Sequence, residues 1–196
     1  TSAKLQLNAV AAGSSLLYAP IIMNEDMTWG FYLRLTFNTS KNNYAIIALY
    51  SDSTSVIKAS NCFYLQIGKD YDSIQLFYKH HDVLNKIKTF SGLQTNTTNN
   101  ELTFKIDRTL EGNYLFKIKT GSDKECIDTV QLMDTIKSNY FFSWQCIYTS
   151  SNATRFYLDE VHIGKVVSDT ANIIKSDTIE KGDLLINEIL FNPIPD

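Results

Sequence analysis

Apolar and polar residues alternate with a period of two along most of the chain. Residues 29–37 carry large apolar side chains at the odd positions, and the pattern recurs in 63–67, 102–107, 114–119 and 142–148. This period is that of a β-strand with one buried face. We expect the following side chains to be buried between two sheets: Trp29, Phe31, Leu33, Phe63, Leu65, Phe104, Ile106, Phe116 and Phe142.

Polar, turn-forming segments separate these runs. Residues 38–43, 68–73, 95–100 and 111–113 are rich in Asn, Ser, Thr, Asp or Gly. Short strands with such turns at intervals of about ten residues indicate an antiparallel sandwich or barrel. Residues 44–50 are mostly apolar on both faces, which predicts a strand in the middle of a sheet. No segment shows sustained helical periodicity, so the predicted fold class is all-β.

The apolar pattern changes phase within residues 155–164. Phe156 and Leu158 are at even positions, whereas Val161 and Ile163 are at odd positions. A β-bulge near residues 159–160 would bring both pairs to one face. A strand buried on both faces explains the same pattern, so both alternatives stay open at this stage.

The composition divides the chain into three parts. Residues 1–165 form the predicted sandwich, and residues 166–182 are polar and are interpreted as a linker. Residues 183–196 form a strongly apolar segment that we interpret as the first strand of a further, truncated domain. Because an unpaired apolar strand needs a sheet edge, we expect it to dock on the sandwich or to pair with a second molecule in a dimer.

Composition and charge exclude several classes of protein. The 196 residues are 44% hydrophobic, enough for a full-sized core, and no apolar run approaches the roughly 20 residues that span a bilayer. The formal net charge is −3. This charge argues against a nucleic-acid partner held by phosphate contacts.

Metal and disulfide chemistry has little support in the sequence. Cys62, Cys126 and Cys146 are odd in number and lack C-x-x-C spacing, which argues against a cysteine zinc site. We expect free thiols, with a Cys126–Cys146 bridge as the alternative. His80 and His81 precede Asp82, but adjacent strand residues point to opposite faces. We therefore expect a solvated strand end there, and neither a metal nor a cofactor.

Catalytic motifs are equally scarce. The sequence contains no G-x-S-x-G, H-E-x-x-H, P-loop or G-x-G-x-x-G motif. The only candidate carboxylate pair is Asp159–Glu160, with Asp107 or Glu101 elsewhere. Neighbouring strand residues do not share a face, so two such carboxylates would not act on one sugar. We expect a protein that is not an enzyme.

Several aromatic residues are out of phase with the core. Tyr32 and Tyr64, and less clearly Phe77, would point outward from their strands. Together with Arg34 and Gln66 they would line an outward sheet face, where aromatic rings and polar groups can bind a glycan. Ordinary cross-strand pairing on an exposed sheet is the alternative. The candidate ligand-binding residues are Tyr32, Arg34, Tyr64 and Gln66.

Six segments resemble a module of secreted proteins from Bacteroidetes-type bacteria. These segments are residues 28–38, 43–52, 63–68, 138–142, 146–151 and 156–164. The module is similar to the concanavalin A-like (laminin-G-like) jelly roll, and the resemblance covers residues 1 to about 165. Residues 183–193 resemble the opening strand of a lamin-tail domain. The resemblance implies a jelly-roll fold and an extracellular or outer cell-surface location, with the export signal removed.

These observations favour a non-catalytic binding or adhesion module of a secreted or cell-surface multidomain protein, with a glycan as its ligand. A structural spacer without a ligand and a glycoside hydrolase are the alternatives. The glucanase branch of the superfamily carries a Glu-x-Asp-x-x-Glu strand, which this chain lacks. An exposed stripe of the four candidate residues would favour binding, whereas a flat sheet covered by Lys and Thr would favour a spacer. A cleft with two carboxylates about 5–9 Å apart would favour hydrolysis.

Overall fold

The computed structural model describes residues 4–132 and 139–165. The regular elements in these ranges are β-strands and two single turns of 3-10 helix, η1 (Lys69–Tyr71) and η2 (Ser150–Asn152). None of the helices in this part of the chain is long and apolar enough to cross a membrane. The predicted linker at 166–182 and the predicted strand at 183–196 lie outside the described residues.

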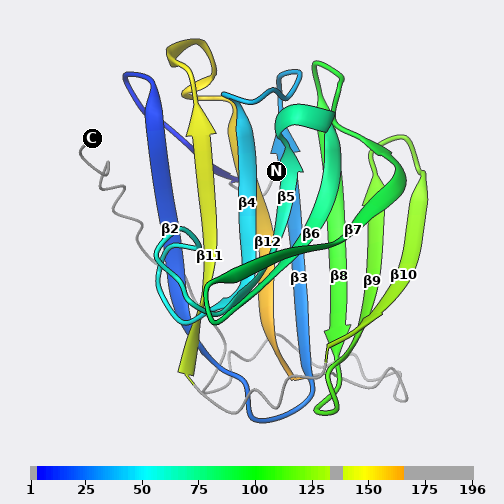
Figure 1. Cartoon of the computed structure of the whole chain (residues 1–196). Coiled ribbons are helices and arrows are strands. Elements are labelled where there is room, and N and C mark those ends of the chain that lie inside the picture. Colours follow the sequence, from blue (N-terminus) through cyan, green and yellow to red (C-terminus); the bar gives the residue numbers. More distant parts are fainter. Residues whose placement is uncertain (1–3, 133–138, 166–196) are drawn as a thin grey trace, which may run out of the picture.

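Two antiparallel sheets, each with six strands in the described part of the chain, pack face to face (Figure 1). Sheet A has the order β1 (Leu5–Gln6), β12 (Phe156–Lys165), β3 (Met27–Leu35), β8 (Asn100–Arg108), β9 (Asn113–Thr120) and β10 (Glu125–Gln131). Sheet B has the order β2 (Gly13–Ile22), β11 (Asn139–Tyr148), β4 (Tyr44–Ser51), β5 (Cys62–Gly68), β6 (Ser73–His80) and β7 (Val83–Gln94). The predicted antiparallel sandwich is therefore confirmed.

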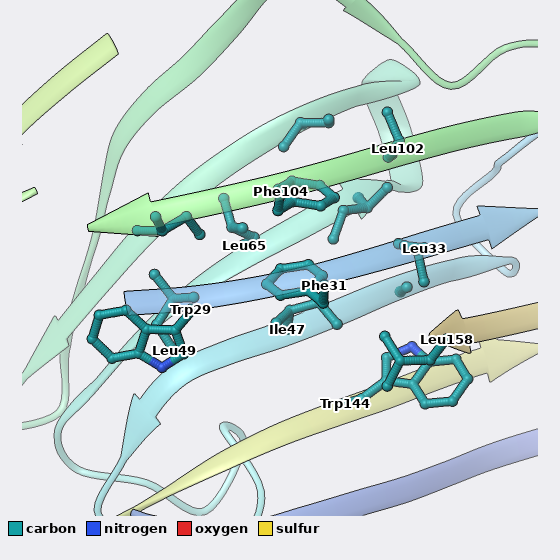
Figure 2. Packing of buried hydrophobic residues seen from close by; sticks show 14 of the residues in the cluster. Trp29, Phe31, Leu33, Ile47, Leu49, Leu65, Leu102, Phe104, Trp144 and Leu158 are labelled. Carbon is teal, nitrogen blue, oxygen red and sulfur yellow. The ribbon is translucent and has the colours of Figure 1, made fainter. Parts of the chain in front are cut away.

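The core lies between the two sheets and contains the predicted side chains. All nine residues expected there are buried, with at most 2% of their surface exposed. Figure 2 shows side chains of β3 and β8 facing side chains of β4 and β5. At the centre, the rings of Phe31 and Phe104 stack with their centroids 4.6 Å apart. Each large apolar side chain buried in this way stabilises the fold by about 1.5–3 kcal/mol.

Strand β4 is covered on both faces, as its sequence predicts. It lies between β11 and β5 in sheet B, and its inner face contributes Ile47 and Leu49 to the core. On the outer face, Ile46 and Ala48 form a second apolar cluster with Val56 from the segment between β4 and β5. This outer cluster explains why residues 44–50 show no alternation.

The change of phase near the end of β12 is a β-bulge. The register of β12 against β3 shifts between Asp159 and His162, and Glu160 has a positive φ of 54°. The Glu160 backbone N–H donates to Asp159 Oδ1 at 2.9 Å. Val161 and Ile163 consequently pack against the same core as the buried pair Phe156 and Leu158. Of the two alternatives left open by the sequence, the bulge is the correct one.

The three cysteines are free thiols on three different strands, and the alternative of a Cys126–Cys146 bridge is wrong. Cys146 on β11 is part of the core, and Cys62 on β5 belongs to the outer cluster. Cys126 on β10 is half-buried against the core. All three therefore behave as small apolar side chains.

Candidate functional site

The four candidate residues do not share a face. Tyr32 and Arg34 lie on β3 in sheet A, whereas Tyr64 and Gln66 lie on β5 in sheet B. Each pair alternates with core residues of its own strand and therefore points out of the sandwich on its own side. One ligand cannot contact both pairs, so the single stripe expected from the sequence is replaced by two separate surfaces.

The sheet A pair is engaged within the protein. Arg34 Nε donates to Asn99 Oδ1 at 2.8 Å and lies 3.7 Å from Glu101 Oε1. The hydrogen bond from Asn99 is the main cause that lowers the pKa of the Glu101 carboxyl. The Lys4 ammonium lies over the Tyr32 ring, 4.0 Å from its centroid. A ligand on this surface would have to compete with these existing contacts.

The sheet B pair lies in a hollow. Two adjoining cavities of about 350 and 270 Å³ open on the outer face of sheet B, and Tyr64 and Gln66 line both. We call this surface the sheet-B groove. It is lined by Tyr44, Ile46, Val56, Ile57, Tyr64, Gln66, Lys69, Tyr71, Gln75, Phe77, Lys79, Leu84, Lys86, Gln145 and Ile147.

Three glutamines cross the groove in one row. The strand registers place Gln145 opposite Ile46, Ile46 opposite Gln66, and Gln66 opposite Gln75. Their exposed fractions are only 3%, 7% and 4% for Gln145, Gln66 and Gln75. Gln145 Oε1 has no hydrogen-bond partner among the described residues. This oxygen is itself buried, and a buried acceptor left unpaired costs about 1–3 kcal/mol.

Aromatic rings form the next row of the groove. Tyr64 on β5 lies opposite Phe77 on β6, and their rings stack with centroids 5.2 Å apart and an interplanar angle of 12°. Burial is the main cause that raises the pKa of the Tyr64 hydroxyl far above its usual range, so this group stays a neutral donor. At the rim, η1 presents Tyr71, which is 73% exposed. The groove thus offers apolar ring surface beside polar amides.

The segment between β4 and β5 forms one wall of the groove and is drawn in cyan in Figure 1. Val56 and Ala59 of this wall pack on the outer apolar cluster. The Asp52 carboxylate accepts the backbone N–H groups of Ser60 at 3.0 Å and Asn61 at 2.9 Å, which closes the base of the segment. Lys79 Nζ donates to the Ala59 carbonyl. These contacts hold the wall in place without any ligand.

A larger cavity, of about 430 Å³, lies elsewhere, between residues 92–102 and 120–124. No aromatic side chain is among its described lining residues. Its central amide is already paired, because Asn100 Nδ2 donates to the carbonyls of Phe37 and Thr97, both at 2.8 Å. The sheet-B groove is therefore the better candidate despite its smaller cavities.

The histidine pair lies at a strand end, as expected, but its geometry differs from the prediction. The rings of His80 and His81 contact each other edge to face, with centroids 4.0 Å apart. His81 and Asp82 have positive φ values of 48° and 64° and form the turn between β6 and β7, so the strand rule does not apply to them. Across residues 4–132 and 139–165, no group of three or more His, Cys, Asp or Glu side chains is placed to hold a metal ion.

Sequence reasoning missed several residues of the groove. Gln145 falls between Trp144 and Cys146 in the alternating run 142–148, so its outward direction was readable. Gln75 falls between Ile74 and Leu76 in the same way, so its outward direction was readable too. Tyr71 had no such signal, because its position depends on the turn between β5 and β6.

No protein-family model and no curated protein matches the sequence. Among solved structures, the VIP36 exoplasmic/lumenal domain in its Ca²⁺/Man-bound form is similar, with a TM-score of 0.63 and 9% identity over 90% of this chain and 87% of that chain. The legume lectin-like domain from Entamoeba histolytica has a TM-score of 0.55 and 10% identity, covering 84% of each chain. Lectin I-B4 from Griffonia simplicifolia has the same TM-score and identity, over 84% of this chain and 88% of that chain.

Such low identities establish the fold alone. The similar structures give no support to the expected Bacteroidetes-type source or to the expected lamin-tail domain. The chain has an all-β fold of two antiparallel sheets, the concanavalin A-like jelly roll that the family resemblance of its sequence implies.

Proposed function

We propose that the chain is a non-catalytic glycan-binding module of a secreted or cell-surface multidomain protein, and that its ligand binds in the sheet-B groove. The observation that carries this proposal is the hollow on the outer face of sheet B, where the side chains of Gln66, Gln75 and Gln145 lie beside the stacked rings of Tyr64 and Phe77. The names of the similar structures, a Ca²⁺/Man-bound domain and a lectin, are consistent with this class of ligand.

The chemistry of the groove suits a sugar ring. A sugar presents hydroxyl groups around its edge and C–H groups on its faces. The amides of Gln66, Gln75 and Gln145 match the hydroxyls, and the rings of Phe77 and Tyr71 match the C–H surface. The cavities are at the lower end of the usual size for small-ligand sites, about 300–1,000 Å³. Tyr64 and Gln66, two of the sequence candidates, keep their proposed role at the centre of this surface.

The same surface argues against the two alternatives. Glycoside hydrolysis normally needs two carboxylates about 5–9.5 Å apart, and no Asp or Glu is among the described lining residues of the groove. A spacer would have no reason to keep a hollow sheet face with exposed apolar side chains. Ile57, Tyr71 and Leu84 are all exposed at this face.

A glycan array with the full chain tests the proposal. We expect binding to at least one glycan, weakened about tenfold by Gln145→Leu, which removes the amide but keeps most of the volume. Tyr32→Ala, on the opposite sheet, is the matched control and should leave binding unchanged. Thermal unfolding of each variant verifies that it is folded.

Two results would count against the proposed site. If no glycan on the array binds, the function is wrong. If Tyr32→Ala or Arg34→Ala abolishes binding while Gln145→Leu does not, the ligand lies on sheet A. That comparison decides whether Tyr32 and Arg34, the other two candidates from the sequence, have any part in binding.

A further inference from the structure

The sheet-B groove carries positive charge on a protein of net negative charge. Lys69, Lys79 and Lys86 are among its lining residues, and no described Asp or Glu is. The whole chain has a formal charge of −3. The local excess of lysine is therefore opposite in sign to the average surface.

The three lysines differ in the contacts that their ammonium groups make within the protein. Lys79 donates to the Ala59 carbonyl and lies 3.4 Å from Asp82 Oδ1, so it belongs to the wall of the groove. Lys69 and Lys86 form no salt bridge within the described residues. The Lys69 ammonium lies 5.4 Å from the centroid of the Tyr44 ring, which keeps its charge over the groove. Two ammonium groups thus remain available to a ligand.

These two groups flank the polar part of the site. Lys69 follows the end of β5, Lys86 lies opposite Phe77 in the pairing of β6 with β7, and both line the 270 Å³ cavity together with Gln66 and Gln75. An anionic group there would form charge-assisted hydrogen bonds, which are roughly twice as strong as neutral ones. The low exposure of the glutamines means that part of the surroundings is not water, which strengthens such contacts further.

We infer that the groove selects anionic glycans, in which a uronate carboxylate or a sulfate ester lies between Lys69 and Lys86. This inference rests on the proposed glycan-binding function and narrows its ligand class. Neutral sugars would leave two lysines unpaired, whereas an anionic sugar pairs them and still uses the amide row.

Affinity electrophoresis of the full chain in gels containing four polymers separates the possibilities. Polygalacturonate carries carboxylates without sulfate, carrageenan carries sulfate without carboxylate, and galactomannan and mixed-linkage β-glucan are neutral. We expect retardation by at least one anionic polymer and little or none by the neutral ones. Retardation by polygalacturonate would identify the carboxylate as the recognised group, and retardation by carrageenan would identify the sulfate.

Charge variants and the salt dependence of binding test whether Lys69 and Lys86 hold the anionic group. Lys69→Met and Lys86→Met should each weaken binding of the anionic polymer about tenfold, as loss of a charged hydrogen bond does. Lys105→Met is the matched control, because Lys105 is an exposed lysine on β8 of sheet A and its loss changes the net charge equally. Binding should also fall between 0.05 and 0.5 M salt, as roughly expected when the Debye length shortens.

The outcomes separate the inference from the function on which it rests. Equal binding of neutral and anionic polymers, insensitive to Lys69→Met and Lys86→Met, overturns the anionic selectivity and leaves the glycan-binding function standing. Binding of anionic polymers that is lost only with Lys105→Met also overturns the inference. No retardation by any polymer, together with an empty glycan array, overturns both.

Discussion

Gly68 and Thr39 approach so closely that a Cβ on Gly68 would lie 2.4 Å from the Thr39 Cβ. Gly68 also has a positive φ of 92°, at the point where β5 ends and η1 begins. The Thr39 hydroxyl is anchored by Thr95 Oγ1 at 2.8 Å and by Asp72 Oδ1 at 2.9 Å. This contact fixes the turn that brings Lys69 and Tyr71 to the rim of the sheet-B groove.

Gly68→Ala should therefore lower both stability and ligand binding. We expect a loss of more than about 2 kcal/mol in the free energy of unfolding, from backbone strain and the collision with Thr39 together. Gly92→Ala is the matched control, because Gly92 has a φ of 74° but no atom within 4 Å of the added Cβ. Urea titrations of both variants measure the difference. Equal losses would show that the Thr39 contact contributes nothing.

The alternation of residue types predicted which side of each strand is buried, but not which strands are neighbours. The pattern correctly predicted that Trp29 and Phe104 lie in the core. It also correctly predicted that Tyr32 and Tyr64 point away from the core. A period of two carries no information about the sheet to which a strand belongs. The grouping of Tyr32 with Tyr64 therefore needed the strand order, which depends on pairing over long sequence distances.

A local break in the alternation of apolar and polar residues can predict where the backbone departs from regular strand geometry. The change of phase in 155–164 predicted the bulge at Glu160 as one of two alternatives. The His80–His81 contact was missed because a two-residue turn with positive φ replaces the strand geometry there. The amide row of the groove was missed because it is formed by residues from three strands that only the register aligns.

The core assignment has a direct test at Phe104. Its ring is 1% exposed and stacks on Phe31, so Phe104→Ala should cost about 3–5 kcal/mol in a denaturant titration. Ile127→Ala on β10 is the control, because Ile127 is 59% exposed and its loss should cost less than about 0.5 kcal/mol. A loss below about 1 kcal/mol at Phe104 would contradict the assignment of its face.

The three thiols should react at different rates. The thiolate is the reactive form, and burial raises the pKa of each cysteine: Cys62 to about 12, and Cys146 well above its ordinary value. Cys126 is half-buried, and burial followed by the charge of Asp128 raises its pKa as well. With iodoacetamide near pH 8, mass spectrometry should find labelling in the order Cys126, Cys62, Cys146. In guanidinium chloride the three should react alike, and fast native labelling of Cys146 would contradict its place in the core.

The segment 183–196 lies outside the described residues, and its docking stays a prediction from the sequence. It carries seven large apolar side chains, each worth about 1.5–3 kcal/mol when buried. Deleting 183–196 should therefore lower the melting temperature or convert a dimer to a monomer in light scattering. Unchanged stability and mass, with free amide exchange in this segment, would refute the prediction.

Asp159 and Glu160 provide the final test of the non-catalytic hypothesis. They form the bulge of β12 in sheet A, so they lie on the other sheet from the groove. Asp159→Asn keeps an oxygen that can accept the Glu160 backbone N–H, and Glu160→Gln keeps the length of an exposed side chain. We therefore expect both variants to retain the fold and the glycan affinity of the unaltered chain, measured by affinity electrophoresis. A reducing-sugar assay on any polymer that binds completes the test. Hydrolysis by the unaltered chain that both substitutions abolish would show that the bulge, and not the groove, is the functional site.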